Sequence, residues 1–320
     1  MTRQNKLLFK ILLVSALIFA FSLIFSKKDR NAAKSVESAI LNPSHKSEVS
    51  LIEIETGESG AITLKKQGDF WLLSKEGEKG QAICTIADSK IINSLIENAA
   101  KIRKLYAISE KISDYERLGL TENLSTSISF LKNNSSLYTK VHFGYSDSIK
   151  NRIFLRSESS KAAYECENDF QQYLTTQTNY WSEGEIFPEI ENPVKITLEI
   201  NEGSEVSPEK TLSLEEKSPN FAQKTGTLLS LRHGNISEPK DNSHEETGKS
   251  GKSMAILTIQ DGNGRIARLT FYALQDGSYF YTKNVTPSEI DSQETRFALY
   301  SENAAYEISE WTYKRIISLF

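Results

Sequence analysis

The sequence predicts an α+β protein in which an N-terminal transmembrane helix precedes two tandem related modules, each a mostly antiparallel sheet with one or two helices. Three observations predict this class. An apolar run, LLFKILLVSALIFAFSLIF, extends from Leu7 to Phe25. Short β-prone runs separated by polar turns follow it. Residues 127–143 of the first half resemble residues 255–271 of the second half in residue order.

The composition is that of a folded chain. Of the 320 residues, 38% are hydrophobic and 25% are charged, with 16 Gly and 7 Pro, as in ordinary globular proteins. The formal net charge of −4 argues against nucleic-acid binding, which depends on clustered cations that release counterions from phosphates. Cys84 and Cys166 are too few for a disulfide framework or a four-thiolate metal site, and they leave one disulfide open.

Residues 1–26 are expected to form a cytoplasmic tip and a membrane anchor. The run from Leu7 to Phe25 would span about 28 Å as a helix, enough to cross a bilayer. Lys10 interrupts it near one end, where a long side chain can reach the headgroups, and the uninterrupted part runs from Ile11 to Phe25. A cleaved signal peptide is the alternative, although the cleavage site is poor.

The basic residues flanking the anchor do not fix its orientation. Three lie on each side: Arg3, Lys6 and Lys10 before it, and Lys27, Lys28 and Arg30 after it. The positive-inside count is therefore a tie, and a long downstream domain can translocate despite such charges.

The polar residues 27–47 are predicted to be a tether, and residues 48–190 the first module. A meander with Trp71 in its core is predicted, followed by a helix capped at Thr85 or Asp88 within DSKIINSLIENAAKIRKLYAI, where apolar residues recur at three- and four-residue spacing. Tyr115 to Leu120 should end in a turn at Gly119. Strands are expected over 49–54, 62–64, 70–72, 127–131, 137–143 and 152–155, and a short helix over 169–174.

Residues 191–320 are predicted to be the second module, with strands over 195–200 and 211–214. Residues 127–143 and 255–271 align without a gap. The segment from Arg152 and the segment from Arg296 share Ala-Ala-Tyr-Glu, which indicates an internal duplication. Residues 234–253 have the Ser, Glu, Lys and Gly content of a disordered insertion.

No motif identifies catalytic, cofactor-binding or metal-binding residues. Gly248-Lys249-Ser250 lacks the preceding glycine of a phosphate-binding loop, and the four His residues are dispersed. Carboxylates are plentiful, so a paired-acid glycosidase stays open. The aromatic residues that recur in both halves, including Tyr164, Tyr306 and Trp311, are expected to serve mainly core packing.

These features resemble a bacterial family, the membrane-anchored domain of unknown function 4340. The resemblance covers most of the chain and rests on the anchor and four short motifs: Trp71-Leu72, Ala87-Asp88, Tyr115-x-x-Leu118-Gly119-Leu120 and Ala162-Ala163-Tyr164-Glu165. It implies an extracytoplasmic α+β domain, often in two copies, that assists a gliding-motility-type membrane complex with an ABC-type ATPase and permease. The absence of a clear second Trp motif and the long insertion depart from the family pattern.

We therefore expect a non-catalytic, single-pass protein of the bacterial inner membrane with most of its chain in the periplasm. Its expected partners are the bilayer and an ABC-type permease and ATPase, with no cofactor, metal or nucleic acid. Two alternatives stay open: an envelope hydrolase acting on glycan or lipid, and a purely structural periplasmic spacer.

Overall fold

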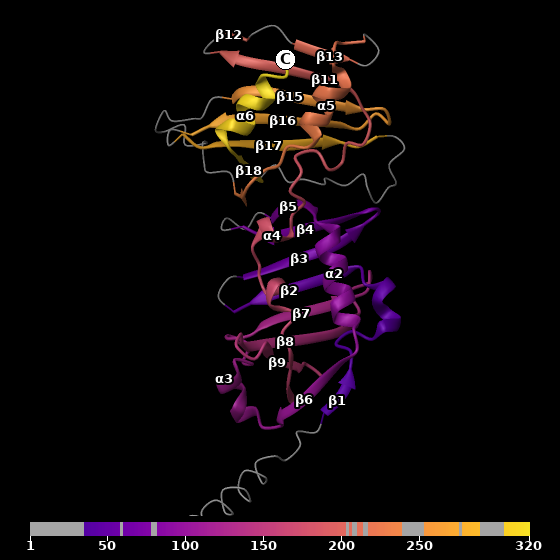
Figure 1. The fold of residues 1–320 in the computed structure, drawn as a ribbon, viewed down its shortest axis with the longest axis vertical. Coiled ribbons are helices and arrows are strands. Elements are labelled where there is room, and N and C mark those ends of the chain that lie inside the picture. Colours follow the sequence, from indigo (N-terminus) through magenta and orange to yellow (C-terminus); the bar gives the residue numbers. More distant parts are fainter. Residues whose placement is uncertain are drawn as a thin grey trace, which may run out of the picture.

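A computed structural model describes residues 35–57, 60–77, 82–202, 205–206, 210–213, 217–238, 253–274, 277–288 and 304–320. They form two sheets that follow one another along the long axis of the molecule (Figure 1). Every pair of neighbouring strands described is antiparallel. The expected architecture of mostly antiparallel sheets with few helices is confirmed.

The first sheet has the strand order β1-β6-β10-β9-β8-β7-β2-β3-β4-β5. Its strands are β1 (Ser35–Ser38), β2 (Leu51–Thr56), β3 (Gly60–Gln67), β4 (Phe70–Glu76), β5 (Ala82–Ala87), β6 (Arg103–Ser109), β7 (Thr126–Leu131), β8 (Leu137–Asp147), β9 (Arg152–Ser157) and β10 (Ala163–Glu167). The helical segments of this half are η1 (Pro43–Glu48), α2 (Ser89–Ala100), η2 (Ile112–Asp114), α3 (Tyr115–Leu118), η3 (Gln171–Tyr173) and α4 (Thr178–Trp181).

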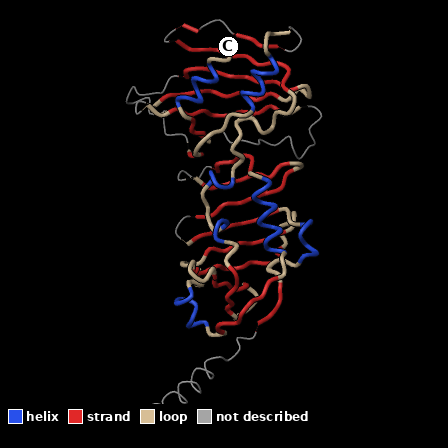
Figure 2. The backbone as a smooth tube through the Cα atoms, in the orientation of Figure 1, coloured by secondary structure: helices blue, strands red, loops and turns tan. Residues whose placement is uncertain are grey.

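The second sheet has the order β12-β11-β15-β16-β17-β18-β14, with β13 also paired to β11. Its strands are β11 (Pro193–Glu202), β12 (Glu205–Val206), β13 (Lys210–Ser213), β14 (Ile236–Ser237), β15 (Ser253–Asp261), β16 (Ile266–Ala273), β17 (Tyr279–Thr286) and β18 (Ala305–Ile308). Helices α5 (Phe221–Leu229) and α6 (Glu310–Ile317) lie in front of this sheet, as α2 lies in front of the first sheet (Figure 2).

Helix α2 covers one face of the first sheet, which we call the inner face. Asp88 caps the helix, as predicted, and its carboxylate accepts hydrogen bonds from the backbone N–H groups of Lys90 and Ile91 at 2.8 and 3.3 Å. Leu95 and Ala99 are buried in the same core as Trp71 and the inward residues of β2 and β7. The predicted core position of Trp71 is confirmed.

The helix ends earlier than the sequence predicted. Residues 101–108 were expected to be helical, but Lys101 is extended and Arg103–Ser109 form β6. Arg103 and Leu105 are buried on either side of exposed Lys104, which is a strand alternation. Pairing of β6 with the distant strands β1 and β10 decides its conformation.

Part of the predicted tether is folded. Strand β1 lies within residues 27–47, and η1 begins there and ends at Glu48. Leu41 is fully buried, and its N–H donates to the Ala99 carbonyl at 2.9 Å. Of the helix expected over 169–174, only the single turn η3 forms. Cys84 and Cys166 are free, so the structure contains no bridge between them.

The expected anchor, with Leu7, Lys10, Ile11 and Phe25, lies outside the described residues. Within the described ranges, no helix has the length and apolar character needed to cross a membrane.

The two sheets share one continuous junction. Ile186, Phe187 and Ile190 lie between them and belong to the same buried cluster as Leu72 of β4 and the core of the second sheet. The Lys283 ammonium lies 2.8 Å from the Glu189 carboxylate, with side chains 1% and 0% exposed. A continuous apolar core with a buried ion pair favours a rigid connection.

The described strands of both sheets follow the same neighbour order, β6-β10-β9-β8-β7-β2-β3 in the first and β14-β18-β17-β16-β15-β11-β13 in the second. Their registers also agree. Tyr164 faces Leu155 and Tyr306 faces Tyr281, while Glu165 and Glu307 face Phe154 and Phe280, respectively. The shared Ala-Ala-Tyr-Glu residues therefore occupy equivalent positions.

The registers change two details of the predicted alignment. Thr126 faces Phe143, whereas Ala255 faces Phe271, so the first hairpin contains one more residue, and the alignment needs a gap at the β-bulge beside Leu137 in β8. By neighbour order the counterpart of β9 is β17, not the segment from Arg296, whose first residues lie outside the described ranges.

Candidate functional site

A row of polar side chains crosses the outer face of the first sheet, opposite α2. In register, Glu55 of β2 faces Ser127 of β7, Ser127 faces His142 of β8, and His142 faces Arg156 of β9. Directly opposed residues of neighbouring strands point to the same face. These side chains therefore form one row over strands that lie far apart in the sequence.

A hydrogen-bond network joins this row to two further residues. Ser125 Oγ lies 3.2 Å from His142 Nδ1, and His142 Nε2 pairs with Glu158 Oε2. Glu158 also lies 3.5 Å from Arg156 Nη1. Because Nε2 donates its proton to Glu158, Nδ1 is left to accept from the Ser125 hydroxyl.

A second part of the network lies beside the first. Glu55 Oε2 accepts a hydrogen bond from Lys140 Nζ at 2.7 Å and another from Ser127 Oγ at 3.0 Å. Both parts line a pocket of about 430 Å³. The residues lining it are Glu55, Thr56, Gly57, Glu122, Ser125, Ser127, Lys140, His142 and Glu158.

The electrostatics of the pocket keep its histidine neutral and its carboxylates ionised. Burial lowers the pKa of His142, and the charge of Arg156 lowers it further, against the raising effect of Glu158. The hydrogen bond with His142 lowers the pKa of Glu158, and the hydrogen bond from Lys140 lowers that of Glu55. At neutral pH the pocket therefore offers a neutral imidazole between charged groups.

The segment after β6 builds one wall of the pocket. Leu118 and Leu120 pack against Ala163 and the partly buried Phe154. Gly119 has a φ of 70°, a left-handed conformation suited to glycine, and ends α3. The Leu120 carbonyl accepts from Arg156 Nε at 3.2 Å. This packing fixes the path of the chain that brings Ser125 to His142.

Two close contacts hold this wall in place. The Tyr115 hydroxyl donates to the Lys161 carbonyl at 2.8 Å. A Cβ at Gly144 would lie 2.2 Å from the Leu118 carbonyl oxygen, so only glycine permits this approach. The Tyr115-x-x-Leu118-Gly119-Leu120 motif is thus a structural support of the pocket.

The second sheet does not repeat the serine, histidine and arginine of this row at the equivalent positions. Its registers place Glu199, Ile256, Thr270 and Thr282 where the first sheet has Glu55, Ser127, His142 and Arg156. The second sheet thus has polar residues at three of the four positions, but none of them is a serine, histidine or arginine. Burying polar groups is unfavourable unless they are satisfied, so this row points to a function rather than to a requirement of the fold.

The order Ser125, His142, Glu158 resembles the nucleophile, base and acid of serine hydrolases, with two differences. The serine contacts Nδ1 rather than Nε2, and the acid is the exposed member. Ser125 is 4% exposed, whereas the Glu158 side chain is 51% exposed. Among the described residues, no group of three or more His, Cys, Asp or Glu side chains could hold a metal ion.

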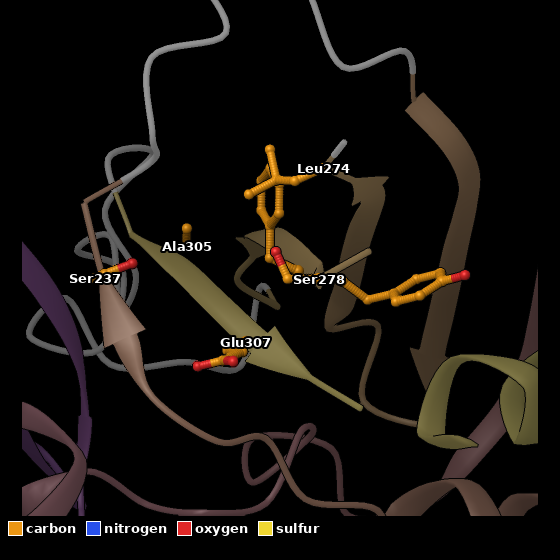
Figure 3. A pocket seen from close by; sticks show the side chains of 7 residues that line it. Ser237, Leu274, Ser278, Ala305 and Glu307 are labelled. Carbon is orange, nitrogen blue, oxygen red and sulfur yellow. The ribbon is translucent and has the colours of Figure 1, made fainter. Parts of the chain in front are cut away.

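A smaller cavity of about 230 Å³ lies in the second module, beside β14, β17 and β18 (Figure 3). Its lining residues are Ser237, Leu274, Ser278, Tyr279, Phe280, Ala305 and Glu307. Glu307 accepts a hydrogen bond from Asn235 at 3.1 Å. With a single carboxylate and no histidine or lysine in its lining, this cavity offers less chemistry than the pocket of the first module.

Most of the residues singled out from the sequence have a structural role in the fold. Asp88 caps α2, Tyr115 and Gly119 shape the pocket wall, Tyr164 is half-buried, and Tyr306 is buried at the junction, where its hydroxyl donates to Thr85 at 2.8 Å. The core role expected for Trp311 is wrong, since it is 68% exposed: α6 buries Thr312, Tyr313 and Ile316, and Trp311 lies on its other side.

Ser125, His142 and Glu158 were not predicted as a site. The only local signal was the alternation of polar and apolar residues in β7 and β8.

Comparison with protein families gives one match. The family model for the domain of unknown function DUF4340 matches residues 81–237. The matched segment is just under half of the chain and supports the resemblance to the DUF4340 domain family. It contains the pocket wall, Ser125, His142 and Glu158, and it extends through the junction to β14. Neither the curated proteins nor the solved structures include a significant match.

Proposed function

We propose that this chain is a non-catalytic, membrane-anchored envelope protein that serves as an accessory component of an ABC-type membrane complex. The proposal rests on the junction, because its shared core joins the two sheets into one rigid unit, which we call the arm. The arm begins at β1, the first described strand after the apolar N-terminal run, and ends in the second sheet (Figure 1). Because the arm begins with the first sheet, the pocket on that sheet would lie at a set distance from the anchor, with the second sheet held rigidly beyond it.

Several contacts support a rigid arm. Lys283 pairs with Glu189, and Arg265 Nη1 donates to the Glu189 carbonyl at 2.7 Å. The Thr178 hydroxyl donates to the Ile236 carbonyl at 3.0 Å. These bonds link the segment before β11 and the first module to the second sheet.

We further propose that the two modules arose by internal duplication and then specialised. The common neighbour order and the equivalent Ala-Ala-Tyr-Glu registers support this origin. In this account the first module carries recognition, in the pocket lined by Ser125, His142 and Glu158, and the second module extends the arm.

The proposed partner is an ABC-type permease with its ATPase, of the gliding-motility type. This choice rests on the family resemblance. Tethering both proteins in one membrane raises their effective concentration, so a pocket of modest affinity is sufficient for association.

Co-purification tests the accessory role. Full-length tagged protein is isolated from native membranes in mild detergent after brief crosslinking, and the wild type is compared with His142→Gln/Glu158→Gln. We expect a permease or ATPase in reproducible ratio with the wild type and several-fold less with the double variant. Glu310→Gln, a surface change in α6, is the matched control and should retain the partner. Equal recovery of the permease or ATPase with all three proteins would show that the pocket takes no part in the interaction.

A second candidate function is that of an envelope hydrolase acting on glycan or lipid. It is favoured by the network of Ser125, His142 and Glu158. Its test is covalent labelling of the full-length protein with a fluorophosphonate, which reacts with activated serines. Labelling that disappears in Ser125→Ala would support the hydrolase. Absence of labelling under conditions that label a known serine hydrolase would leave the accessory role as the better account.

A further inference from the structure

Exposed apolar side chains gather at one edge of the first sheet. Four of the exposed large apolar residues in the described part lie on or beside β1 and β6. They are Val36, Ile102, Ile108 and Ile112, which are 50%, 64%, 38% and 64% exposed. Single exposed apolar residues are ordinary, but a group along one edge indicates a contact surface.

This edge is the end of the molecule farthest from the second sheet. Strand order in the first sheet runs from β5 at the junction to β6 and β1 at the opposite edge, and Figure 1 shows β1 and β6 at the end away from the C-terminus. Ile102 directly precedes β6, Ile108 is the penultimate residue of β6, and Ile112 follows in η2. The apolar side chains are therefore spread along the edge instead of forming a compact pocket.

The same edge carries exposed lysines among its apolar side chains. Lys101, Lys104 and Lys111 lie along it and can pair with anionic headgroups, while Glu37, Glu110 and Asp114 are the acidic residues of the edge. Basic side chains next to apolar ones are the combination that binds anionic headgroups and the outer part of the acyl region.

The length of the chain preceding this edge restricts what it can meet. Residues 26–34 separate the apolar run ending at Phe25 from Ser35 of β1. At roughly 3.5 Å per residue, such a segment reaches at most about 30 Å even when fully extended. If the apolar run is a membrane anchor, as proposed above, β1 must stay close to the bilayer surface.

We propose that the β1–β6 edge is a membrane-contact surface, seated on the headgroups of the bilayer that holds the anchor. Val36, Ile108 and Ile112 enter the boundary between headgroups and acyl chains, and the lysines pair with anionic lipids. The arm then stands away from the membrane with the second module outermost. This inference rests on the proposed anchoring and adds the orientation of the folded part.

The test places a fluorophore along the arm of the full-length protein. Ile112→Cys and, as the matched control, Trp311→Cys are each labelled with an environment-sensitive dye in a Cys84→Ser background, where buried Cys166 is unreactive. The proteins are reconstituted in vesicles of phosphatidylcholine with phosphatidylglycerol and titrated with headgroup spin-labelled lipid. We expect quenching at position 112 to exceed that at position 311 by at least two-fold.

The possible outcomes separate the two proposals. Vesicle flotation without extra quenching at position 112 overturns the membrane-contact edge but leaves the anchor intact. Failure of the protein to float overturns both. A third outcome is that the dye at position 112 is shielded from solvent in detergent without lipid, and that mass photometry detects dimers. This result would assign the edge to contact with a second copy of the chain and would also overturn the proposal. Ile108→Ser in the Ile112→Cys protein should reduce the quenching, while Leu137→Ser should not.

Discussion

Replacing Lys283 by methionine tests the rigid junction. The Lys283 ammonium contacts the Glu189 carboxylate at 2.8 Å and also donates to the Ile186 carbonyl, and both charged side chains are almost fully excluded from solvent. Burial lowers the pKa of Lys283, and Glu189 opposes that shift. Methionine fills a similar volume but removes the Lys283 charge from its place beside the carboxylate.

Removing one partner of a buried ion pair costs about 3–5 kcal/mol, because the remaining charge stays desolvated and loses the attraction of that partner. For a folded part of this size, each kcal/mol lowers Tm by roughly 2–4 °C, so a loss on the order of 6–20 °C is expected. Differential scanning calorimetry of the full-length protein in detergent measures it, with urea titration as a second determination.

Two variants make this result interpretable. Lys314→Met removes the exposed partner of Glu310 and should lower the stability much less than Lys283→Met, because solvent screens surface pairs. Lys283→Met/Glu189→Met replaces both buried charges and should recover most of the loss. A loss for Lys283→Met no larger than that for Lys314→Met would refute the reasoning that the junction depends on this pair.

Three further predictions concern the first module. Hydrogen bonds from Lys140 and His142 lower the pKa of Glu55 and Glu158, respectively, below the ordinary glutamate value. Both carboxylates therefore stabilise the protein at neutral pH, and this stabilisation is lost as pH falls through the lowered pKa values. Glu55→Gln/Glu158→Gln should flatten this loss in urea titrations at pH 7 and pH 3.5. Gly119→Ala should destabilise the protein by about 1–3 kcal/mol, because Gly119 has a left-handed backbone conformation. The control Gly226→Ala, inside α5, should be neutral or stabilising. Thermal melts in which Gly226→Ala is the less stable variant would contradict this prediction. Asp88→Ala should cost about 1 kcal/mol through loss of the α2 cap, and an unchanged urea midpoint would argue against the cap.

Local signals explain which elements could be predicted from the sequence. The apolar spacing of α2 and its Asp88 cap are contained in a short stretch, and the alternating residues of β2, β7 and β8 are similarly local. Strand β6 could not be recognised, because its residues continue the helical spacing and only its pairing with β1 and β10 makes it a strand. Strand β1 was missed because a short polar strand at the edge of a sheet resembles a tether in sequence.

The pocket could not be predicted because its geometry depends on register. Glu55, Ser127, His142 and Arg156 come from four strands, and a shift of one residue in any of them would turn its side chain to the other face. The Tyr115-x-x-Leu118-Gly119-Leu120 motif was visible in the sequence. Its role in supporting the segment that carries Glu122 and Ser125 into the pocket follows only from the packing of Leu118 on Ala163.

The central claim is that an anchored arm presents the first-module pocket to an ABC-type membrane complex. The most direct measurement is site-specific photo-crosslinking in native membranes, with a photoreactive residue replacing Glu122 at the pocket and Glu310 in α6 of the second module. The account predicts a crosslink from position 122 to a permease or ATPase subunit that disappears in His142→Gln. Crosslinks to that complex only from position 310, or from neither position while the protein stays in the soluble fraction, would contradict it.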